Sequence, residues 1–312
     1  MPVHAYPLPT MTAIFLNGEF VQPDQALVSA FDAGLTHGVG LFETMTGHMK
    51  TPESEPEVVR LWDHMARLAA SAKELRLSDQ LRTQALGHAV LQTVKKCALP
   101  DQRVRLTITG GNLSALAPAR APGQQPHDPT ILIVAQPATQ YPAEMFEQGV
   151  VAAIADLKAN PFDPTAAHKT LNYWPRLSEL QRAAVKGAAE ALVFQITNHL
   201  CGGCVSNAII VKDGALFTPI VRGEEVKGGL PSPVLPGITR AAVLELARSM
   251  DLETTSTMLS IDDVLGADEL MLTNSSWGIL PVVRVEAEQI ADGTVGPITK
   301  KLREALNAPA SE

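Results

Sequence analysis

The sequence predicts a mixed α+β (mixed α/β) chain with two domains, and three observations carry this prediction. Apolar residues recur with helical spacing in some segments and alternate with strand spacing in others. The predicted strands and helices do not alternate regularly, which argues against a (β/α)8 barrel. The segment Pro137–Pro142 interrupts both patterns and is the best linker candidate. We therefore predict an N-terminal domain over residues 1–137 and a C-terminal domain over residues 138–312.

The composition is that of a globular protein without a nucleic-acid or membrane partner. The 312 residues are 46% hydrophobic and 19% charged, and 25 basic against 33 acidic residues give a net charge of −8. A pI near 5.5 disfavours binding to phosphate backbones. No apolar run reaches the roughly 18–20 residues that span a bilayer, and Met1–Thr10 has no signal-peptide pattern. Three cysteines are no disulfide framework, so we expect a soluble cytoplasmic protein.

The first half begins with a predicted hairpin and two helices. Asn17-Gly18 is a turn dipeptide between the apolar runs 14–16 and 19–21. Residues 59–76 and 79–97 are predicted to be helices. In the first of these, apolar residues recur at steps of four and three and form one stripe: Leu61, Met65, Leu68, Ala72 and Leu75.

Strands complete the first domain. Within residues 103–109, Val104, Leu106 and Ile108 alternate with polar residues, which predicts a half-buried strand. Arg105 then lies on the polar face of this strand. Residues 110–129 are rich in Gly, Ala and Pro and predict a loop, and residues 130–136 predict another strand.

The second half mixes strands and helices around one long loop. Lys212-Asp213-Gly214 is the turn of a predicted strand–turn–strand. Residues 219–237 carry several glycines and prolines and predict the loop. The remaining predicted elements are strands at 149–156, 191–197 and 269–273 and helices at 174–187, 238–250 and near 261–266.

Two segments are candidates for anion binding. Leu235-Pro236-Gly237-Ile238-Thr239-Arg240 begins a predicted helix, whose first N–H groups and dipole suit a phosphate. Thr273-Asn274-Ser275-Ser276-Trp277-Gly278 follows a strand and presents hydroxyl and N–H groups. Taken alone, each segment is better explained as an ordinary helix start or turn.

Two further features could carry chemistry. Lys169, set among Leu171, Tyr173 and Trp174, would have a lowered pKa if desolvated, and the free amine is the form that makes imines. A surface lysine before a helix is the plain alternative. Cys201-Gly202-Gly203-Cys204 could be a redox pair or half a metal site, but no second CxxC exists. Two small residues beside a tight glycine turn explain that motif as well.

Taken together and in order, these features resemble the fold-type IV (class IV) pyridoxal-phosphate enzymes over about residues 14–300. That family contains branched-chain aminotransferases, D-amino-acid aminotransferases and aminodeoxychorismate lyases. No single stretch is specific, but eight occur in the family's order. They are Asn17–Glu19, Phe31–Thr44, His64–Leu68, Lys169–Tyr173, Ser206–Gly214, Leu216–Pro219, Leu235–Arg240 and Leu272–Val282.

The resemblance implies a fold and a cofactor. It implies a small N-terminal α/β domain, a larger C-terminal pseudo-barrel domain, pyridoxal 5'-phosphate between them, and a homodimer. By matching positions, Lys169 would form the Schiff base and shuttle the proton. Arg67, which flanks the apolar stripe beside Leu68, would bind the cofactor phosphate.

The resemblance also implies roles for other residues. Backbone N–H groups of Ile238 and Thr239 and the Ser275 hydroxyl would bind the phosphate, and Tyr173 would reach the ring oxygen. The substrate, a small amino acid or oxo acid, would meet four residues: His37, Arg105, Ser276 and Trp277. Arg105 is a candidate for its carboxylate, as a bidentate partner.

The sequence departs from the family pattern at three positions. Gly202 stands where the family has the glutamate that keeps the cofactor's ring nitrogen protonated, and residues 196–211 contain no acid. His37 stands where an aromatic residue is usual, and Gly110 where an arginine is often found. Family membership therefore does not by itself imply full transaminase activity.

Three functions stay open from the sequence. The first is a class IV aminotransferase of amino-acid metabolism, slowed by Gly202. The second is a lyase of the aminodeoxychorismate type, which Phe42-Glu43-Thr44 and Thr273–Val282 favour. The third is a family scaffold with lost or altered cofactor chemistry, in which Cys201–Cys204 would do redox or metal work.

Overall fold

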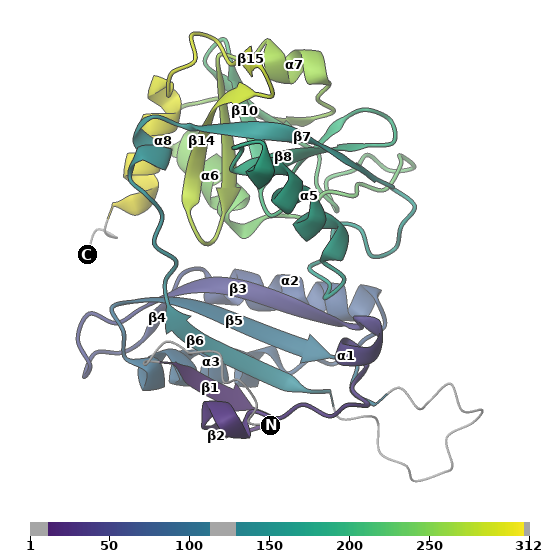
Figure 1. The fold of residues 1–312 in the computed structure, drawn as a ribbon, viewed down its shortest axis with the longest axis vertical. Helices are drawn as coiled ribbons and strands as arrows, with labels where there is room; N and C mark the ends of the chain where they lie inside the picture. Colours follow the sequence, from purple (N-terminus) through teal and green to yellow (C-terminus); the bar gives the residue numbers. More distant parts are fainter. Residues whose placement is uncertain (1–11, 113–128, 309–312) are drawn as a thin grey trace. The chain divides into compact units, whose positions relative to one another are not determined.

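A computed structural model describes residues 12–112 and 129–308 of the chain, which divides into two compact units (Figure 1). The N-terminal unit comprises Met1–Thr139 and Lys169–Asn172, and the C-terminal unit comprises Gln140–His168 and Tyr173–Glu312. A short segment distant in sequence thus belongs to the N-terminal unit. Residues 1–137 and 138–312 as separately folding domains stay a prediction.

The N-terminal unit is a six-stranded antiparallel sheet in the order β2-β1-β6-β5-β3-β4. Its strands are β1 (Ala13–Leu16), β2 (Glu19–Val21), β3 (Gly40–His48), β4 (Glu57–Val58), β5 (Asp101–Thr109) and β6 (Ile131–Pro137). Its helices are η1 (Pro23–Gln25), α1 (Ala33–His37), α2 (Leu61–Glu74) and α3 (Thr83–Cys97). The predicted hairpin is confirmed, with Asn17 and Gly18 at φ 50° and 103°.

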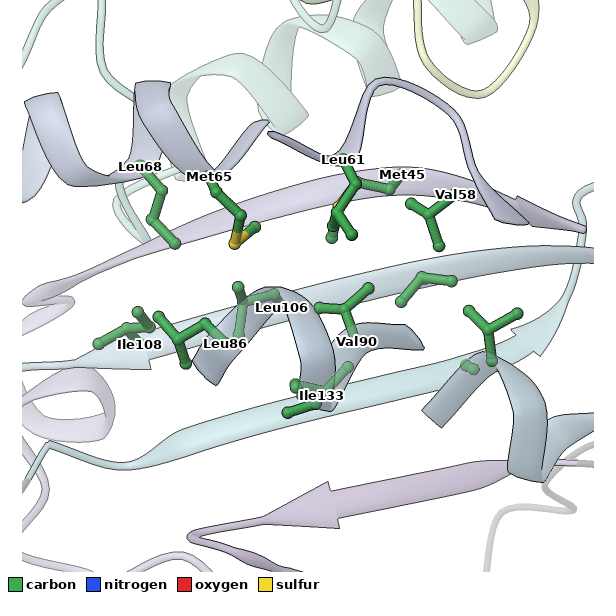
Figure 2. Close-up of a cluster of buried hydrophobic side chains, with 14 of the residues drawn as sticks. Met45, Val58, Leu61, Met65, Leu68, Leu86, Val90, Leu106, Ile108 and Ile133 are labelled. Atoms are coloured by element: carbon green, nitrogen blue, oxygen red, sulfur yellow. The ribbon is translucent and has the colours of Figure 1, made fainter. Parts of the chain in front are cut away.

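Helices α2 and α3 pack against this sheet and form its core (Figure 2). The stripe predicted on α2 is confirmed, because Leu61, Met65 and Leu68 are buried there. On β5 the predicted alternation is also confirmed, since its apolar residues are buried and Arg105 is half-buried. Each buried large apolar side chain contributes about 1.5–3 kcal/mol. Burial of the apolar residues of β5 therefore places Arg105 on the opposite face of this strand.

The C-terminal unit is a mixed nine-stranded sheet. Eight strands follow the order β12-β11-β10-β13-β14-β7-β8-β9, and β15 pairs with β14. They are β7 (Val150–Ala159), β8 (Glu190–Gln195), β9 (Leu200–Gly203), β10 (Asn207–Lys212), β11 (Ala215–Pro219), β12 (Thr254–Thr257), β13 (Glu269–Asn274), β14 (Gly278–Val285) and β15 (Glu288–Gln289). Strand β9 also packs against β10, so the sheet curls back on itself.

Five helices accompany this sheet: α4 (Glu144–Glu147), α5 (Trp174–Val185), α6 (Ile238–Ser249), α7 (Ile261–Leu265) and α8 (Pro297–Asn307). The predicted helices at 174–187, 238–250 and 261–266 are confirmed as α5, α6 and α7. Among the described residues, no helix is long and apolar enough to cross a membrane.

The sequence did not predict β9, β14 or α8. Strand β9 consists of Leu, Cys and two glycines, which carry no alternating pattern. Helix α8 buries only Thr299 and Leu302 fully, so its apolar stripe is thin. The loop predicted at 219–237 is confirmed between β11 and α6, whereas most of the predicted loop at 110–129 lies outside the described residues.

Candidate functional site

Lys169 lies beside the first residues of β3. The N–H of Phe42 donates to the carbonyl of Lys169 at 2.9 Å, and the N–H of Leu171 donates to the carbonyl of Gly40 at 3.0 Å. Gly40 permits this close approach, since a Cβ there would lie 2.5 Å from the Ile108 carbonyl and 2.7 Å from Leu171. The backbone around Lys169 is therefore fixed as an extra edge of the N-terminal sheet.

The ring of Phe42 brings Lys169 and Arg105 together. The Arg105 Cζ lies 3.8 Å from the ring centroid and the Lys169 Nζ lies 4.6 Å from it. The ring is almost fully buried, and cations on such a face are stabilised by the ring quadrupole. Arg105 Nε also donates to Thr107 Oγ1 at 3.3 Å. Two predicted site residues thus share one aromatic neighbour.

Next to Phe42, Glu43 forms a buried cluster with His64 and Arg67. Glu43 accepts from Arg67 Nε at 2.9 Å and from Arg67 Nη2 at 2.5 Å, which is a bidentate pair. His64 Nδ1 donates to Glu43 Oε2 at 2.7 Å. The side chains of Glu43 and His64 are 2% exposed and that of Arg67 is 8% exposed. We call these three residues the Glu43 cluster.

Electrostatics sets the protonation of the Glu43 cluster. Burial alone would raise the pKa of Glu43, but the charge of Arg67 and the hydrogen bonds from His64 and Arg67 outweigh it and lower this pKa to about 2. Burial lowers the pKa of His64, and the charges of Arg67 and Lys169 act in the same direction. At neutral pH the cluster therefore holds a carboxylate, a guanidinium and a neutral imidazole.

This pKa predicts a pH-dependent part of the stability. A carboxyl with pKa about 2 in the folded chain and near 4.5 in the unfolded chain contributes on the order of 3 kcal/mol to the free energy of unfolding at neutral pH. Because the folded pKa is depressed, the contribution is fully present above pH 4.5 and is lost as the pH falls towards 2. We expect Glu43→Gln to lower the free energy of unfolding at pH 7. The difference in this free energy between the wild type and Glu43→Gln should be smaller at pH 3.5 than at pH 7 by at least about 1 kcal/mol. Urea unfolding at both pH values measures this, and a gap that does not change with pH contradicts it.

In the C-terminal unit, the start of α6 lies against β10. Asn207 Nδ2 donates to the carbonyl of Leu235 at 2.9 Å, and a Cβ on Gly237 would collide with Asn207. Gly237 provides no side-chain cap, and Ile238 and Thr239 begin the helix half-buried. The first N–H groups of a helix have no partner within it, so this end can receive an anion.

The Thr273–Gly278 turn lies beside this helix start. Asn207 on β10 pairs with Thr273 on β13, and directly opposed side chains lie on the same sheet face. The Oγ1 of Thr273 is buried without a hydrogen-bond partner among the described residues. Asn274 Oδ1 accepts from the N–H groups of Ser276 and Trp277 at 2.8 and 3.0 Å, which shapes the turn. Orphaned hydroxyl and helix N–H groups are donors that suit a phosphate.

Gly202 lies on β9 beside Asn207, the residue that contacts Gly237 and pairs with Thr273. Its φ is +135°, and a Cβ there would lie 2.7 Å from the Ser206 carbonyl. Arg176 Nη1 donates to the carbonyls of Gly203 and Cys204 at 3.4 and 3.0 Å. The carbonyls that follow this glycine therefore bind a guanidinium.

The nearest acid to this loop is Glu190 on β8. It accepts from the N–H groups of Ala191, Cys204 and Val205 at 3.0–3.2 Å and from Ser206 Oγ at 3.0 Å. Burial raises the pKa of Glu190, and these hydrogen bonds oppose that effect. Both carboxyl oxygens are engaged by the loop, so Glu190 holds the backbone around Gly203 in place.

The cysteines of the CxxC motif are buried free thiols. Burial raises the pKa of both Cys201 and Cys204 to about 12, so neither is a thiolate at neutral pH. No group of three or more metal-binding side chains occurs in residues 12–112 and 129–308. These observations favour the structural explanation of the motif.

Three further residues from the predicted segments are His37, Tyr173 and Arg240, and none of them belongs to the Glu43 cluster. His37 is exposed at the end of α1 and contacts Thr36 Oγ1 at 2.7 Å, although the following Gly38 lies 3.9 Å from Asn172. Tyr173 is the half-buried residue before α5. Arg240, in the α6 motif, binds Glu224 through Nη1 and Nη2 at 3.0 and 2.9 Å and so anchors the loop before the helix.

No role was predicted from the sequence for five residues of the site: Glu43, His64, Phe42, Arg176 and Glu190. The sequence does contain an indication for Glu43 and His64. Glu43 is an acid within an otherwise apolar strand, and His64 lies three residues before Arg67, on the same face of α2. Their pairing joins segments about twenty residues apart and could not be inferred from local patterns.

Comparison with known proteins gives three findings. A sequence model of the family Amino-transferase class IV matches residues 40–285. A branched-chain-amino-acid aminotransferase of Escherichia coli K12 is 30% identical over 299 residues, covering 94% of this chain and 91% of the relative. The chain also resembles two solved structures over 94% of its length. They are the E. coli branched-chain amino acid aminotransferase (TM-score 0.82, 29% identity, 93% of that chain) and 4-amino-4-deoxychorismate lyase from Pseudomonas aeruginosa (TM-score 0.74, 26% identity, 97% of that chain).

Proposed function

Since the chain belongs to the amino-transferase class IV family, we propose that it is a pyridoxal 5'-phosphate-dependent aminotransferase acting on an amino acid and a 2-oxo acid. One observation carries this proposal: Lys169 lies against Phe42, next to the buried Glu43–Arg67 pair. An amine beside the sheet and a fixed guanidinium on α2 are groups that an aldehyde-bearing phosphate ester can use.

The cofactor-binding roles follow from the family resemblance and fit the local chemistry. Lys169 would form the Schiff base and carry the proton. Arg67 would bind the phosphate together with the N–H groups of Ile238 and Thr239 and the hydroxyl of Ser275, while Tyr173 would bind the ring oxygen. The donors at the start of α6 and the orphaned Thr273 hydroxyl support an anion there. When bound, the cofactor supplies an electron-accepting ring.

Arg105 is our candidate for the substrate carboxylate. Its guanidinium stacks on Phe42, on the polar face of β5, and a planar guanidinium binds carboxylates bidentately. We assign His37, Ser276 and Trp277 to the remaining substrate contacts, as the family resemblance implies. The exposed Ser276 and the ordered Asn274 turn are consistent with that role.

Arg67 provides the first test of the cofactor site. A charge-assisted hydrogen bond contributes about 1.5–3 kcal/mol, so Arg67→Ala is expected to weaken cofactor binding by roughly 10- to 150-fold. Titration of the apoprotein with pyridoxal 5'-phosphate, followed by absorbance, measures the dissociation constant. Lys73→Ala removes an exposed cation from the last turn of the same helix and is the matched control. An Arg67→Ala affinity equal to that of the control would remove Arg67 from the site.

A lyase of the aminodeoxychorismate type is the second candidate. The structural likeness to the P. aeruginosa lyase favours it, as do Phe42-Glu43-Thr44 and the segment Thr273–Val282. The two activities differ in their need for a 2-oxo acid acceptor. Amino transfer that depends on added 2-oxo acid supports the aminotransferase, and product release without any acceptor supports the lyase.

We also propose that the chain forms a homodimer. The N-terminal unit exposes four large apolar side chains within residues 27–35, and burying such side chains is a common basis of association. They are Leu27, Val28, Phe31 and Leu35, with 78%, 41%, 75% and 69% of their surfaces exposed. Sedimentation velocity of the wild-type protein measures the oligomeric state directly.

A further inference from the structure

We propose that Glu43, supported by His64, is a positioning residue that orients the Arg67 guanidinium for the cofactor phosphate. The inference rests on the proposed function, because it takes Arg67 as a phosphate ligand. It adds what the family assignment does not give: a reason for a buried carboxylate beside a group that must bind an anion.

The geometry divides the donors of Arg67 into two edges. Glu43 occupies the Nε edge through two hydrogen bonds, from Nε to Oε1 and from Nη2 to Oε2. A guanidinium held in this way can rotate little about its last side-chain torsions. The remaining hydrogens, on Nη1 and on the outer side of Nη2, point along the other edge. In the proposed arrangement the phosphate binds Arg67 at this second edge, which Glu43 does not occupy.

His64 fixes the carboxylate without adding charge. Its Nδ1 donates to Glu43 Oε2 at 2.7 Å, and burial together with the nearby cations keeps the imidazole neutral. His64 and Arg67 lie three residues apart on α2, and Glu43 lies on β3, which α2 covers. One helix face thus supplies both partners of a single carboxylate.

The negative charge of Glu43 and its orienting effect on Arg67 would change phosphate binding in opposite directions. A carboxylate next to Arg67 reduces the attraction of that guanidinium for an anion. If charge alone governed the site, removing the carboxylate would tighten phosphate binding. If Glu43 acts by orienting Arg67, removing it would weaken phosphate binding, even though the local charge becomes more positive. The sign of the change separates the two roles.

The test compares two probes, pyridoxal 5'-phosphate and pyridoxal, which differ only in the phosphate. For Glu43→Gln, whose side chain has nearly the same shape, we expect the dissociation constant of pyridoxal 5'-phosphate to rise roughly 10- to 100-fold, as for other partners that orient a ligand. The dissociation constant of pyridoxal should stay within about threefold, because a positioning role acts only through the phosphate. Tighter or unchanged binding of pyridoxal 5'-phosphate overturns the proposal, and so does an equal loss for both probes.

A double variant tests whether Glu43 acts through Arg67. We expect Glu43→Gln combined with Arg67→Ala to bind no more weakly than Arg67→Ala alone, whereas additive losses overturn the proposal. Asp63→Asn, which breaks the exposed Arg60–Asp63 pair on the same helix, is the matched control. We define phosphate selectivity as the ratio of the dissociation constant of pyridoxal to that of pyridoxal 5'-phosphate. If Arg67→Ala does not change this ratio, the assignment of Arg67 as a phosphate ligand fails as well. If Arg67→Ala lowers selectivity but Glu43→Gln does not, only the positioning role fails.

His64 variants keep the proposal testable if Glu43→Gln does not fold. Removing one member of a buried pair can be strongly destabilising. His64→Asn can place an amide N–H near the position of Nδ1, whereas His64→Leu cannot donate at all. We expect His64→Leu to lose phosphate selectivity and His64→Asn to restore part of it. Equal selectivity in His64→Leu and the wild type overturns the proposal.

Discussion

Replacing Lys169 with alanine is expected to abolish the internal Schiff base and to slow exchange of the substrate α-hydrogen by at least about 10²- to 10⁴-fold. The expected loss is large because one amine performs two tasks: it forms the imine and moves the proton. The side chain lies against Phe42, and its backbone is fixed to β3.

Two measurements check this expectation. Absorbance of the cofactor-loaded protein reports the imine, and NMR in deuterium oxide reports α-hydrogen exchange of an added amino acid. Lys169→Arg is the matched control, because it keeps a cation over Phe42 but cannot form the imine. Both variants should lack the imine band. Persistence of a borohydride-sensitive band in either variant would mean that another lysine carries the cofactor.

The second large effect concerns Gly202. We expect wild-type protein to bind the cofactor but to transaminate common amino acids about 10²- to 10³-fold more slowly than it would with a carboxylate at the ring nitrogen. Among the described residues, the acid beside this loop is Glu190, whose carboxylate is engaged by the N–H groups of Cys204 and Val205, and Arg176 brings a positive charge to the neighbouring carbonyls. A pyridine nitrogen in such surroundings should be unprotonated near pH 7.

The ¹⁵N chemical shift of labelled cofactor in the loaded protein reports this protonation directly. A protonated ring nitrogen, or turnover near 10 s⁻¹ that is typical of enzymes, would contradict the expectation. Gly202→Glu is a poor rescue, because the backbone there has φ +135° and a Cβ would collide with the Ser206 carbonyl. Rescue would first require this backbone to shift, and a lower thermal midpoint should accompany it.

Local patterns predicted several of the elements that carry the candidate site, but not β9, on which Gly202 lies. The stripe on α2 and the alternation on β5 correctly predicted which faces of these elements are buried, whereas the roles of Arg67 and Arg105 stay predictions. The Asn17-Gly18 turn has φ values that few other dipeptides adopt. Such features depend on neighbours in the chain and can be recognised in a single sequence.

The pairing of distant segments could not be predicted in this way. Nothing local indicates that Glu43 accepts from both His64 and Arg67, or that Glu190 receives three donors from the loop that follows β9. Lys169–Asn172 was assigned to the second half of the chain by position, yet it pairs with β3. Contacts of this kind depend on tertiary packing, which the local period of a sequence does not contain.

Borohydride trapping tests the central claim most directly. Wild-type protein is saturated with pyridoxal 5'-phosphate, reduced with borohydride, digested, and mapped by mass spectrometry. The account predicts one phosphopyridoxyl group on the peptide that contains Lys169, together with loss of the near-UV or visible imine band. A label on another lysine, or no label at saturating cofactor, would contradict it.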